Sequence, residues 1–235
     1  MPSEAMSPTP PLTSTAGDAP AWYGKIPGAG DFVNSRLPHA LALWWERWLQ
    51  QGMAAMRQRG ADEIERHYTV APVWNFLIPT GAGASCVQPG CLAPSCDRVG
   101  RYYPVIVTLP MRAADYWNGL PDTADAFYWQ VGHALLDAIR HARAPGDLER
   151  TLERVRLVPG SGRYAERVDG MPAELPEQPA PAAWPGLSGY FDPHGGTSFW
   201  WTNRADGSPL RTHAHTGTPD NALFLTLFGG GQQPG

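Results

Sequence analysis

The stretch Trp22-Tyr-Gly-Lys-Ile-Pro-Gly-Ala-Gly-Asp-Phe-Val-Asn34 runs from a short aromatic segment through a glycine-rich turn toward the first long amphipathic segment of the chain. Gly24, Gly28 and Gly30 are able to adopt positive φ, and Pro27 fixes its own φ. Asp31 can accept hydrogen bonds from nearby backbone N–H groups. The sequence therefore predicts a well-defined corner between a strand and the first helix.

A glycine-rich turn before a helix also raises the possibility of a phosphate-binding loop. A Walker loop requires Gly-Lys followed by Ser or Thr at the end of the loop. Here Lys25 precedes the glycines, and the anionic Asp31 occupies the place that a phosphate would approach. The order of residues argues against nucleotide binding.

The first long helix is predicted over residues 38–59, because apolar residues recur there at intervals of three and four. Pro38 suits a first helical position, and Gly60 ends the segment. Asp62 and Glu65 resemble a capping pair for a short second helix that reaches about Tyr68. The apolar face of the long helix consists of Leu41, Trp44, Trp45, Trp48, Leu49, Gly52, Met53 and Met56.

Three strands are predicted next. Residues 73–78 and 86–93 are short segments of strand-forming types separated by a Gly-rich loop, which makes them plausible antiparallel neighbours. Residues 105–109 are all apolar except Thr108, so both faces of this strand are apolar. The strand should therefore be central and covered on both faces. Helices are therefore expected on both faces of the sheet.

The second half of the chain adds helices and a hairpin. Asp122 is predicted to cap a long helix that ends before Pro145, and a short helix is predicted over residues 147–155. Thr218 and Pro219 are predicted to cap a last helix that the glycines at 229–231 terminate.

Residues 159–196 are rich in Pro, Gly and Ala and are interpreted as a long insertion with Trp184, Leu187, Tyr190 and Phe191 as its possible anchors. Residues 198–202 and 210–215 are predicted to form a hairpin around Asp206-Gly207.

These elements predict one α/β domain over residues 21–230, with a mixed sheet of about five or six strands and helices on both faces, a three-layer sandwich. Residues 1–20 are rich in Pro, Ser, Thr and Ala and are predicted to be a disordered tail. Residues 231–235 are predicted to be a short C-terminal tail.

Charge and hydropathy narrow the function classes. The 235 residues include 18 Lys and Arg against 22 Asp and Glu, which gives a formal net charge of -4. No basic run is present, so we expect no nucleic-acid partner and no anionic membrane surface. No segment approaches the ~20 apolar residues that span a bilayer, and we expect a cytoplasmic protein without membrane insertion.

Cys86, Cys91 and Cys96 are spaced five residues apart, and His213 and His215 alternate along a predicted strand. Structural zinc sites favour cysteine pairs two to four residues apart, so this spacing does not predict a metal site. Cysteine catalysis needs a neighbouring histidine base, which the sequence does not place. We expect reduced thiols in the core and no cofactor.

The segment Asp97-Arg98-Val99-Gly100-Arg101-Tyr102 is polar although it lies between two apolar strands. Asp97 could accept turn N–H groups and pair with an arginine, which would fix the strand geometry. Alternatively, Arg98, Arg101 and Tyr102 could form a partner-binding surface, because Arg and Tyr are enriched at interface hot spots. Both interpretations remain open at this stage.

Trp200 and Trp201 are consecutive residues of a predicted strand, so their side chains point to opposite faces of the sheet. One of them is therefore expected in the core, and the other is an interface candidate.

Four ordered motifs in the chain resemble those of the TagF family, also called ImpM, of type VI secretion accessory proteins. They are Gly24-Lys25-x-Pro27-x-x-Gly30-Asp31-Phe32, a Trp-rich helix, Ala71-Pro72-Val73-Trp74 and Pro94-Ser-x-Asp-Arg-Val-Gly-Arg-Tyr-x-Pro104. The resemblance is strong over residues 22–118. A weaker similarity follows in Ser198-Phe-Trp-Trp and in Gly217-x-Pro219 leading into Leu223-Phe224 and Leu227-Phe228.

The resemblance implies an adaptor that represses type VI secretion after translation by binding the forkhead-associated scaffold protein. It implies no enzymatic activity, no cofactor and no small-molecule substrate. Two alternatives come from other classes. One is a hydrolase or transferase that uses Asp31, Asp97 or a cysteine in a cleft beside the turn at residues 24–31. The other is a structural subunit of the secretion apparatus.

Overall fold

A computed structural model describes residues 19–60, 62–157, 184–204 and 209–230 of the chain. Of the predicted tails, residues 1–18 and 231–235 lie outside the described residues. The same holds for residues 159–183 of the predicted insertion and for the predicted turn at Asp206-Gly207.

The described residues form a seven-stranded sheet in the order β2-β1-β5-β4-β3-β6-β7. The strands are β1 (Ala21–Gly24), β2 (Val33–Ser35), β3 (Trp74–Ile78), β4 (Gln88–Ala93), β5 (Val105–Thr108), β6 (Thr197–Asn203) and β7 (Pro209–Thr216).

Every strand pair in this sheet is antiparallel, so the prediction of a mixed sheet is wrong. The strand count also exceeds the five or six predicted. The sequence analysis missed β2, whose three residues are too few to show an alternation, and whose pairing of Ser35 with Trp22 depends on the corner. The predicted antiparallel pairing of β3 with β4 is confirmed, with Trp74 opposite Leu92.

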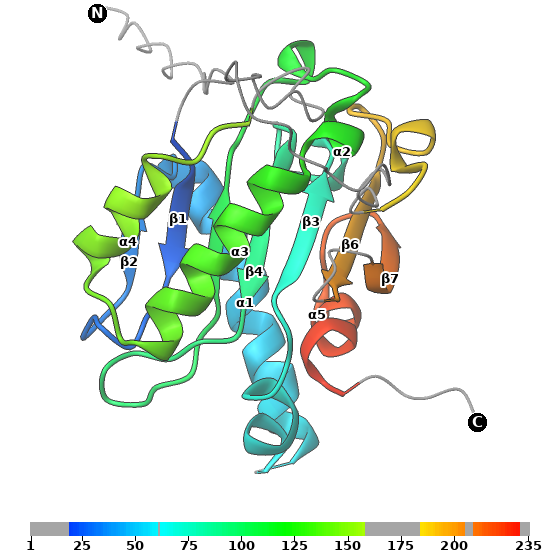
Figure 1. Ribbon diagram of the computed structural model, residues 1–235. Coiled ribbons are helices and arrows are strands. Elements are labelled where there is room, and N and C mark those ends of the chain that lie inside the picture. Colours follow the sequence, from blue (N-terminus) through cyan, green and yellow to red (C-terminus); the bar gives the residue numbers. More distant parts are fainter. Residues whose placement is uncertain (1–18, 61, 158–183, 205–208, 231–235) are drawn as a thin grey trace, which may run out of the picture.

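Helices cover both faces of the sheet (Figure 1). On one face lie α2 (Leu120–Thr123), α3 (Asp125–Arg140) and α4 (Pro145–Leu152). On the other lie α1 (His39–Arg59), a π-helical turn (Ile64–Tyr68) and α5 (Asn221–Phe228). Short 3-10 turns occupy Thr80–Ala82, Ala113–Asp115 and Leu187–Gly189. No helix among the described residues is long and apolar enough to cross a bilayer.

The alternation of side chains along the strands produces two hydrophobic cores, one on each face. The core against α3 contains Trp22, Leu77, Cys91, Val105, Val107 and Trp201. The core against α1 and α5 contains Tyr23, Phe76, Leu92, Ile106 and Trp200. The central strand β5 is buried on both faces, as its continuous apolar sequence predicts.

Three predicted helix caps are wrong. Asp122 lies inside the short helix α2, and a residue within a helix does not have the extended backbone that an N-cap requires. Asp220, and not Thr218, caps α5, where its Oδ1 accepts a hydrogen bond from the backbone N–H of Leu223 at 2.8 Å. Asp62 pairs with Arg66 and caps no helix.

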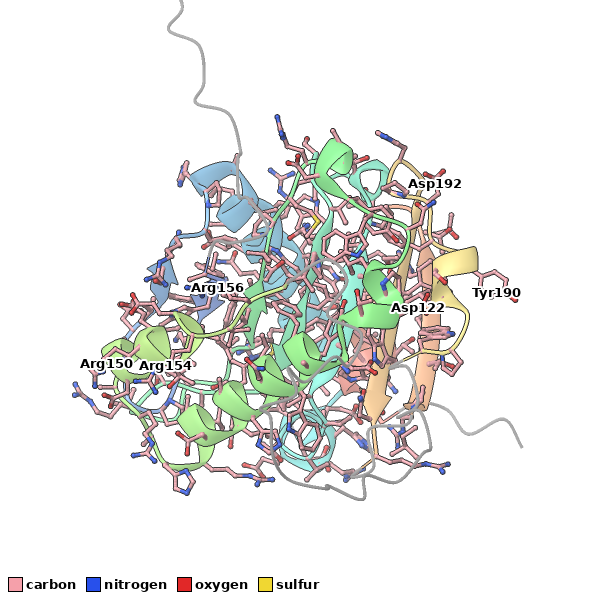
Figure 2. The ribbon with its side chains drawn as sticks, turned by 45° about the horizontal axis from the view of Figure 1, so that its top comes forward. Asp122, Arg150, Arg154, Arg156, Tyr190 and Asp192 are labelled. Carbon is pink, nitrogen blue, oxygen red and sulfur yellow. The ribbon has the colours of Figure 1, made fainter. Side chains whose placement is uncertain are left out.

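The predicted anchors of the insertion are partly confirmed. Leu187 and Phe191 are buried against the α3 face, but Tyr190 is 75% exposed. Figure 2 shows Tyr190 and Asp192 projecting from one side of the molecule, whereas Arg150, Arg154 and Arg156 project from α4 and the segment after it.

The close packing of α1 against α5 depends on Gly52. A Cβ atom at this position would lie 2.1 Å from Cγ of the buried Phe224. We expect Gly52→Ala to lower the free energy of unfolding by about 1–3 kcal/mol, because Phe224 has to move within a filled core. Denaturant unfolding measures the change. Gly132→Ala in α3 is the matched control, since its Cβ would meet no atom of the described residues within 4 Å. Equal stabilities of Gly52→Ala and the wild type would contradict this packing.

Candidate functional site

The glycine-rich corner begins where β1 ends. Gly24 has a φ of 133°, and a Cβ atom there would lie 2.2 Å from the carbonyl oxygen of Pro104 on the neighbouring segment. Only glycine permits this approach. Of the three glycines for which the sequence allowed a positive φ, Gly24 adopts one, whereas Gly28 and Gly30 do not.

Lys25, the next residue, points into the protein and forms an ion pair with Asp97. Its Nζ lies 2.9 Å from Oδ2 of Asp97, and the two side chains are 7% and 0% exposed. The Asp97 carboxylate accepts three further hydrogen bonds: from the backbone N–H of Val99 at 3.1 Å, from the backbone N–H of Arg101 at 2.9 Å and from Arg101 Nε at 2.6 Å. Four donors fill the accepting capacity of this carboxylate.

Burial by itself would raise the pKa of Asp97. The hydrogen bond from Lys25, the backbone and side-chain hydrogen bonds from Arg101 and the charge of Lys25 outweigh that effect and hold the pKa well below its usual value. Asp97 is therefore ionised at neutral pH. Because its lone pairs are already used, this carboxylate is arranged to hold structure rather than to accept a proton or bind a metal.

The glycine-rich motif and the 97–101 motif meet at the ion pair of Lys25 and Asp97. The backbone N–H of Arg98 donates to the carbonyl of Ala29 at 2.8 Å, and Nη2 of Arg101 donates to the carbonyl of Gly30 at 2.9 Å. Gly100 has a φ of 84°, which lets the chain turn beneath the carboxylate of Asp97. Residues 24–32 and 97–101 are thus joined by hydrogen bonds into one unit.

An aromatic group covers the ion pair. Nζ of Lys25 lies 4.7 Å from the ring centroid of Phe32, which is a cation–π distance. Phe32 stacks on Tyr23 and meets the edge of Tyr103 with centroid distances of 5.9 and 4.7 Å. Phe32 remains 41% exposed, so one side of this ring is available at the surface.

Above the buried pair lies an exposed patch, which we call the corner surface. It consists of Asp31, Phe32, Arg98, Val99 and Arg101. The Arg101 side chain is 58% exposed even though its Nε reaches Asp97. Arg101 therefore has the structural role that the sequence left open for it, and its exposed part is accessible at the surface, whereas its role in partner binding stays a prediction.

The remaining motif residues lie at the margin of this surface. Pro27 is partly buried in the turn. Tyr102 is also partly buried, with its ring 6.0 Å from that of Tyr68 and a bridge to Cys96. Both support the backbone of the corner.

The prediction that one of Trp200 and Trp201 is an interface residue is wrong. The two side chains do point to opposite faces, but both faces are covered and both residues are buried. Trp200 packs against Trp48 and Phe76, and Trp201 packs against Tyr128. The predicted alternation of the two side chains is confirmed. The predicted exposure of one of them is wrong, because helices that the sequence of the strand does not specify cover both faces of the sheet.

The three cysteines are free thiols. Cys86 and Cys91 lie in the cores as predicted, whereas Cys96 is only partly buried, so the prediction of a core position is wrong for it. Burial raises the pKa of Cys86 to about 12 and raises that of Cys91 further. The Cys91 thiol donates to Oδ1 of Asn75 at 3.2 Å. In the described part of the chain, no group of three or more His, Cys, Asp and Glu side chains is arranged to hold a metal ion.

Sequence reasoning missed two features, one buried and one at the surface. It did not pair Lys25 with Asp97, for which the local sequence offers no signal. It also passed over Trp129, which is 50% exposed on α3. The signal for Trp129 was present, because this tryptophan lies outside the apolar stripe formed by Phe127, Tyr128 and Val131.

Comparisons with known proteins agree with these motifs. A family model described as "TagF N-terminal domain, Type VI secretion system-associated" matches residues 21–155, which include both halves of the corner. Among solved structures, the chain is similar to PA0076 from Pseudomonas aeruginosa PAO1, with a TM-score of 0.69 and 27% sequence identity. The match covers 92% of this chain and 96% of that chain. A search of curated proteins finds no match. The chain therefore belongs to the TagF family of type VI secretion system-associated proteins.

Proposed function

We propose that this protein is a non-enzymatic, cytoplasmic repressor of type VI secretion that acts after translation by binding the forkhead-associated scaffold protein through its corner surface. Membership of a type VI secretion-associated family supports a role in this secretion system. The observation that carries the proposal is the corner itself. There the glycine-rich motif and the 97–101 motif meet above the buried ion pair of Lys25 and Asp97, which are 72 positions apart in the sequence.

The composition of the corner surface suits protein recognition. Arg98 and Arg101 supply exposed guanidinium groups, and Phe32 and Val99 supply apolar area beside them. Arg and aromatic side chains are enriched among interface hot spots. The hydrogen bonds beneath the surface fix its backbone before binding, which lowers the entropy cost of association.

The same geometry favours binding over hydrolysis. A general base needs a free lone pair directed at the proton it removes. All four accepting positions of Asp97 are occupied by donors of the chain. Asp31 is exposed and accepts from the backbone N–H of Phe32 at 2.8 Å, so its environment resembles that of an ordinary surface carboxylate.

The proposal predicts separate effects for the two arginines. Arg98→Ala should weaken binding to the purified scaffold by about 1–3 kcal/mol and change stability by less than about 0.5 kcal/mol. Arg101→Ala should weaken binding similarly and also lower stability, because it removes the donor to Asp97. Calorimetric titration and thermal unfolding measure both quantities on each variant. Arg211→Ala on β7, at the other edge of the sheet, is the matched exposed control.

Unchanged affinity of Arg98→Ala and Arg101→Ala, with only Arg101→Ala less stable, would leave the corner as a structural element. Two results would favour other functions. Stoichiometric co-purification with assembled sheath or baseplate would indicate a structural subunit. Turnover of an ester, phosphoester or amide substrate that is lost in folded Asp31→Ala would indicate an enzyme.

A further inference from the structure

A hollow of about 750 Å³ lies between α3 and the end of the sheet where β3 begins and β4 and β6 end. The register of β3 with β6 stops at the pair Asn75 and Trp201, although β6 continues to Asn203. Beyond that pair, the described residues of the two strands show no backbone pairing with each other. The side-chain amide of Asn75 donates to Oδ1 of Asn203 at 2.6 Å, and both residues line the hollow. Its volume is within the range of ligand pockets, roughly 300–1,000 Å³.

Exposed apolar side chains line this hollow. Trp129 of α3 is 50% exposed, and its ring lies 4.3 Å from the imidazole ring of His133. Val70, before β3, is 73% exposed. Both residues belong to the lining. Tryptophan is enriched at interfaces, so an exposed tryptophan beside a hollow is a candidate contact for a bound partner.

Gly132 lies in the middle of α3 and also lines the hollow. A glycine inside a helix is less favourable than alanine by about 1 kcal/mol. Gly132 has no packing reason for its small size, because a Cβ atom there would meet no described atom within 4 Å. Its lack of a side chain keeps this part of the helix surface open to an occupant.

The charges around the hollow have one sign. Arg140 of α3 and Arg204, after β6, line it, and none of its described lining residues is Asp or Glu. Two acidic residues of α3, Asp125 and Asp137, are not part of the lining, and Asp137 pairs with Arg143 on the α4 side. This distribution is notable in a chain with a net charge of -4.

We propose that this hollow, which we call the α3 hollow, binds an acidic peptide segment of a partner protein. An apolar side chain of the segment packs against Trp129 in the space above Gly132. Flanking carboxylates pair with Arg140 and Arg204. The α3 hollow shares no residue with the corner surface, so this inference does not depend on the proposed scaffold binding.

The test uses the full-length protein labelled with 5-fluorotryptophan and the peptide acetyl-Glu-Asp-Leu-Phe-Asp-Glu-amide. Trp129→Phe assigns the fluorine resonance of Trp129. Addition of the peptide should shift that resonance in a saturable manner. Two control peptides should not: one with Lys in place of the four acidic residues, and one with Gly-Ser in place of Leu-Phe.

Two variants test the lining directly. Gly132→Leu should abolish peptide binding without lowering the melting temperature, because leucine occupies the space above position 132 in which the apolar side chain of the peptide packs, and because it favours the helix. Arg140→Glu should weaken binding about tenfold, because it replaces attraction with repulsion at the rim. The matched control is Arg47→Glu, an exposed charge reversal on α1 across the sheet, which should leave binding unchanged.

Three results would overturn the proposal. One is an unshifted Trp129 resonance with the acidic peptide. Another is equal binding of the lysine peptide, which would remove the electrostatic argument. The third is full binding by folded Gly132→Leu, which would place the peptide elsewhere on the protein.

Discussion

Asp97→Ala is expected to lower the free energy of unfolding by about 3–5 kcal/mol, the usual effect of removing one partner of a buried ion pair. The substitution leaves the Lys25 ammonium group buried without its counterion. It also leaves the N–H groups of Val99 and Arg101 without their acceptor in the turn. The loss therefore exceeds that of an ordinary surface salt bridge, which contributes at most about 1 kcal/mol.

Urea unfolding of Asp97→Ala and of the wild type gives this difference. Asp31→Ala is the matched control, because Asp31 is an exposed carboxylate of the same corner that accepts from the adjacent backbone N–H. Its stability should stay within about 0.5 kcal/mol of the wild type. If Asp97→Ala were as stable as Asp31→Ala, the buried pair would not hold the corner together.

The pH dependence of stability follows from the lowered pKa of Asp97. In the unfolded chain this carboxyl titrates near its ordinary value of about 3.9, so the unfolded state takes up the proton first as the pH falls. The stability that Asp97 contributes is complete above that pH and is lost as the pH falls through the folded-state pKa. The stability difference between the wild type and Asp97→Asn should be constant from neutral pH to about pH 5 and should shrink below about pH 4.

Trp200→Ala and Trp201→Ala are each expected to destabilise the protein by about 3–5 kcal/mol, because each removes a large buried side chain and leaves a cavity. Trp200 is fully buried among Trp48 and Phe76, with centroid distances of 5.5 and 5.2 Å. Trp201 is buried on the opposite face, 4.8 Å from the ring of Tyr128. The two substitutions thus damage different cores.

Thermal and urea unfolding of both variants test this expectation. Trp129→Ala is the control tryptophan, since its side chain is half exposed and its removal should change stability by about 1 kcal/mol or less. A variant of Trp200 or Trp201 that kept wild-type stability but lost partner binding would restore the interface role that the buried position contradicts.

These variants also separate the folding role of the chain from its proposed binding roles. Asp97, Trp200 and Trp201 are expected to act on stability. Arg98 and Arg140 are exposed and are expected to act on two different partner surfaces. The family match covers residues 21–155, so it includes the corner surface and α3, whereas Arg204 of the α3 hollow lies beyond it.

The amino-acid sequence by itself determined the elements whose signal is local. The three- and four-residue spacing over residues 38–59 predicted α1, which the structure places at His39–Arg59. The continuous apolar sequence at 105–109 predicted a central strand covered on both faces, and β5 is buried throughout. The turn chemistry of Asp97 with Arg101 was also predictable, because the two residues are four positions apart.

The tertiary structure decided what depends on residues far apart in the chain. The all-antiparallel strand order follows from packing and connection geometry, which no single segment encodes. The burial of both Trp200 and Trp201 required helices on each face of β6. Residues of α1 and α5 pack in the core around Trp200, and residues of α3 pack in the core around Trp201, and α1 and α3 lie far from β6 in the sequence. Lys25 acquired its partner only when the corner and the 97–101 turn met, across 72 positions. Side-chain periodicity carries information over one helix or strand, whereas ion pairing and burial are properties of the assembled fold.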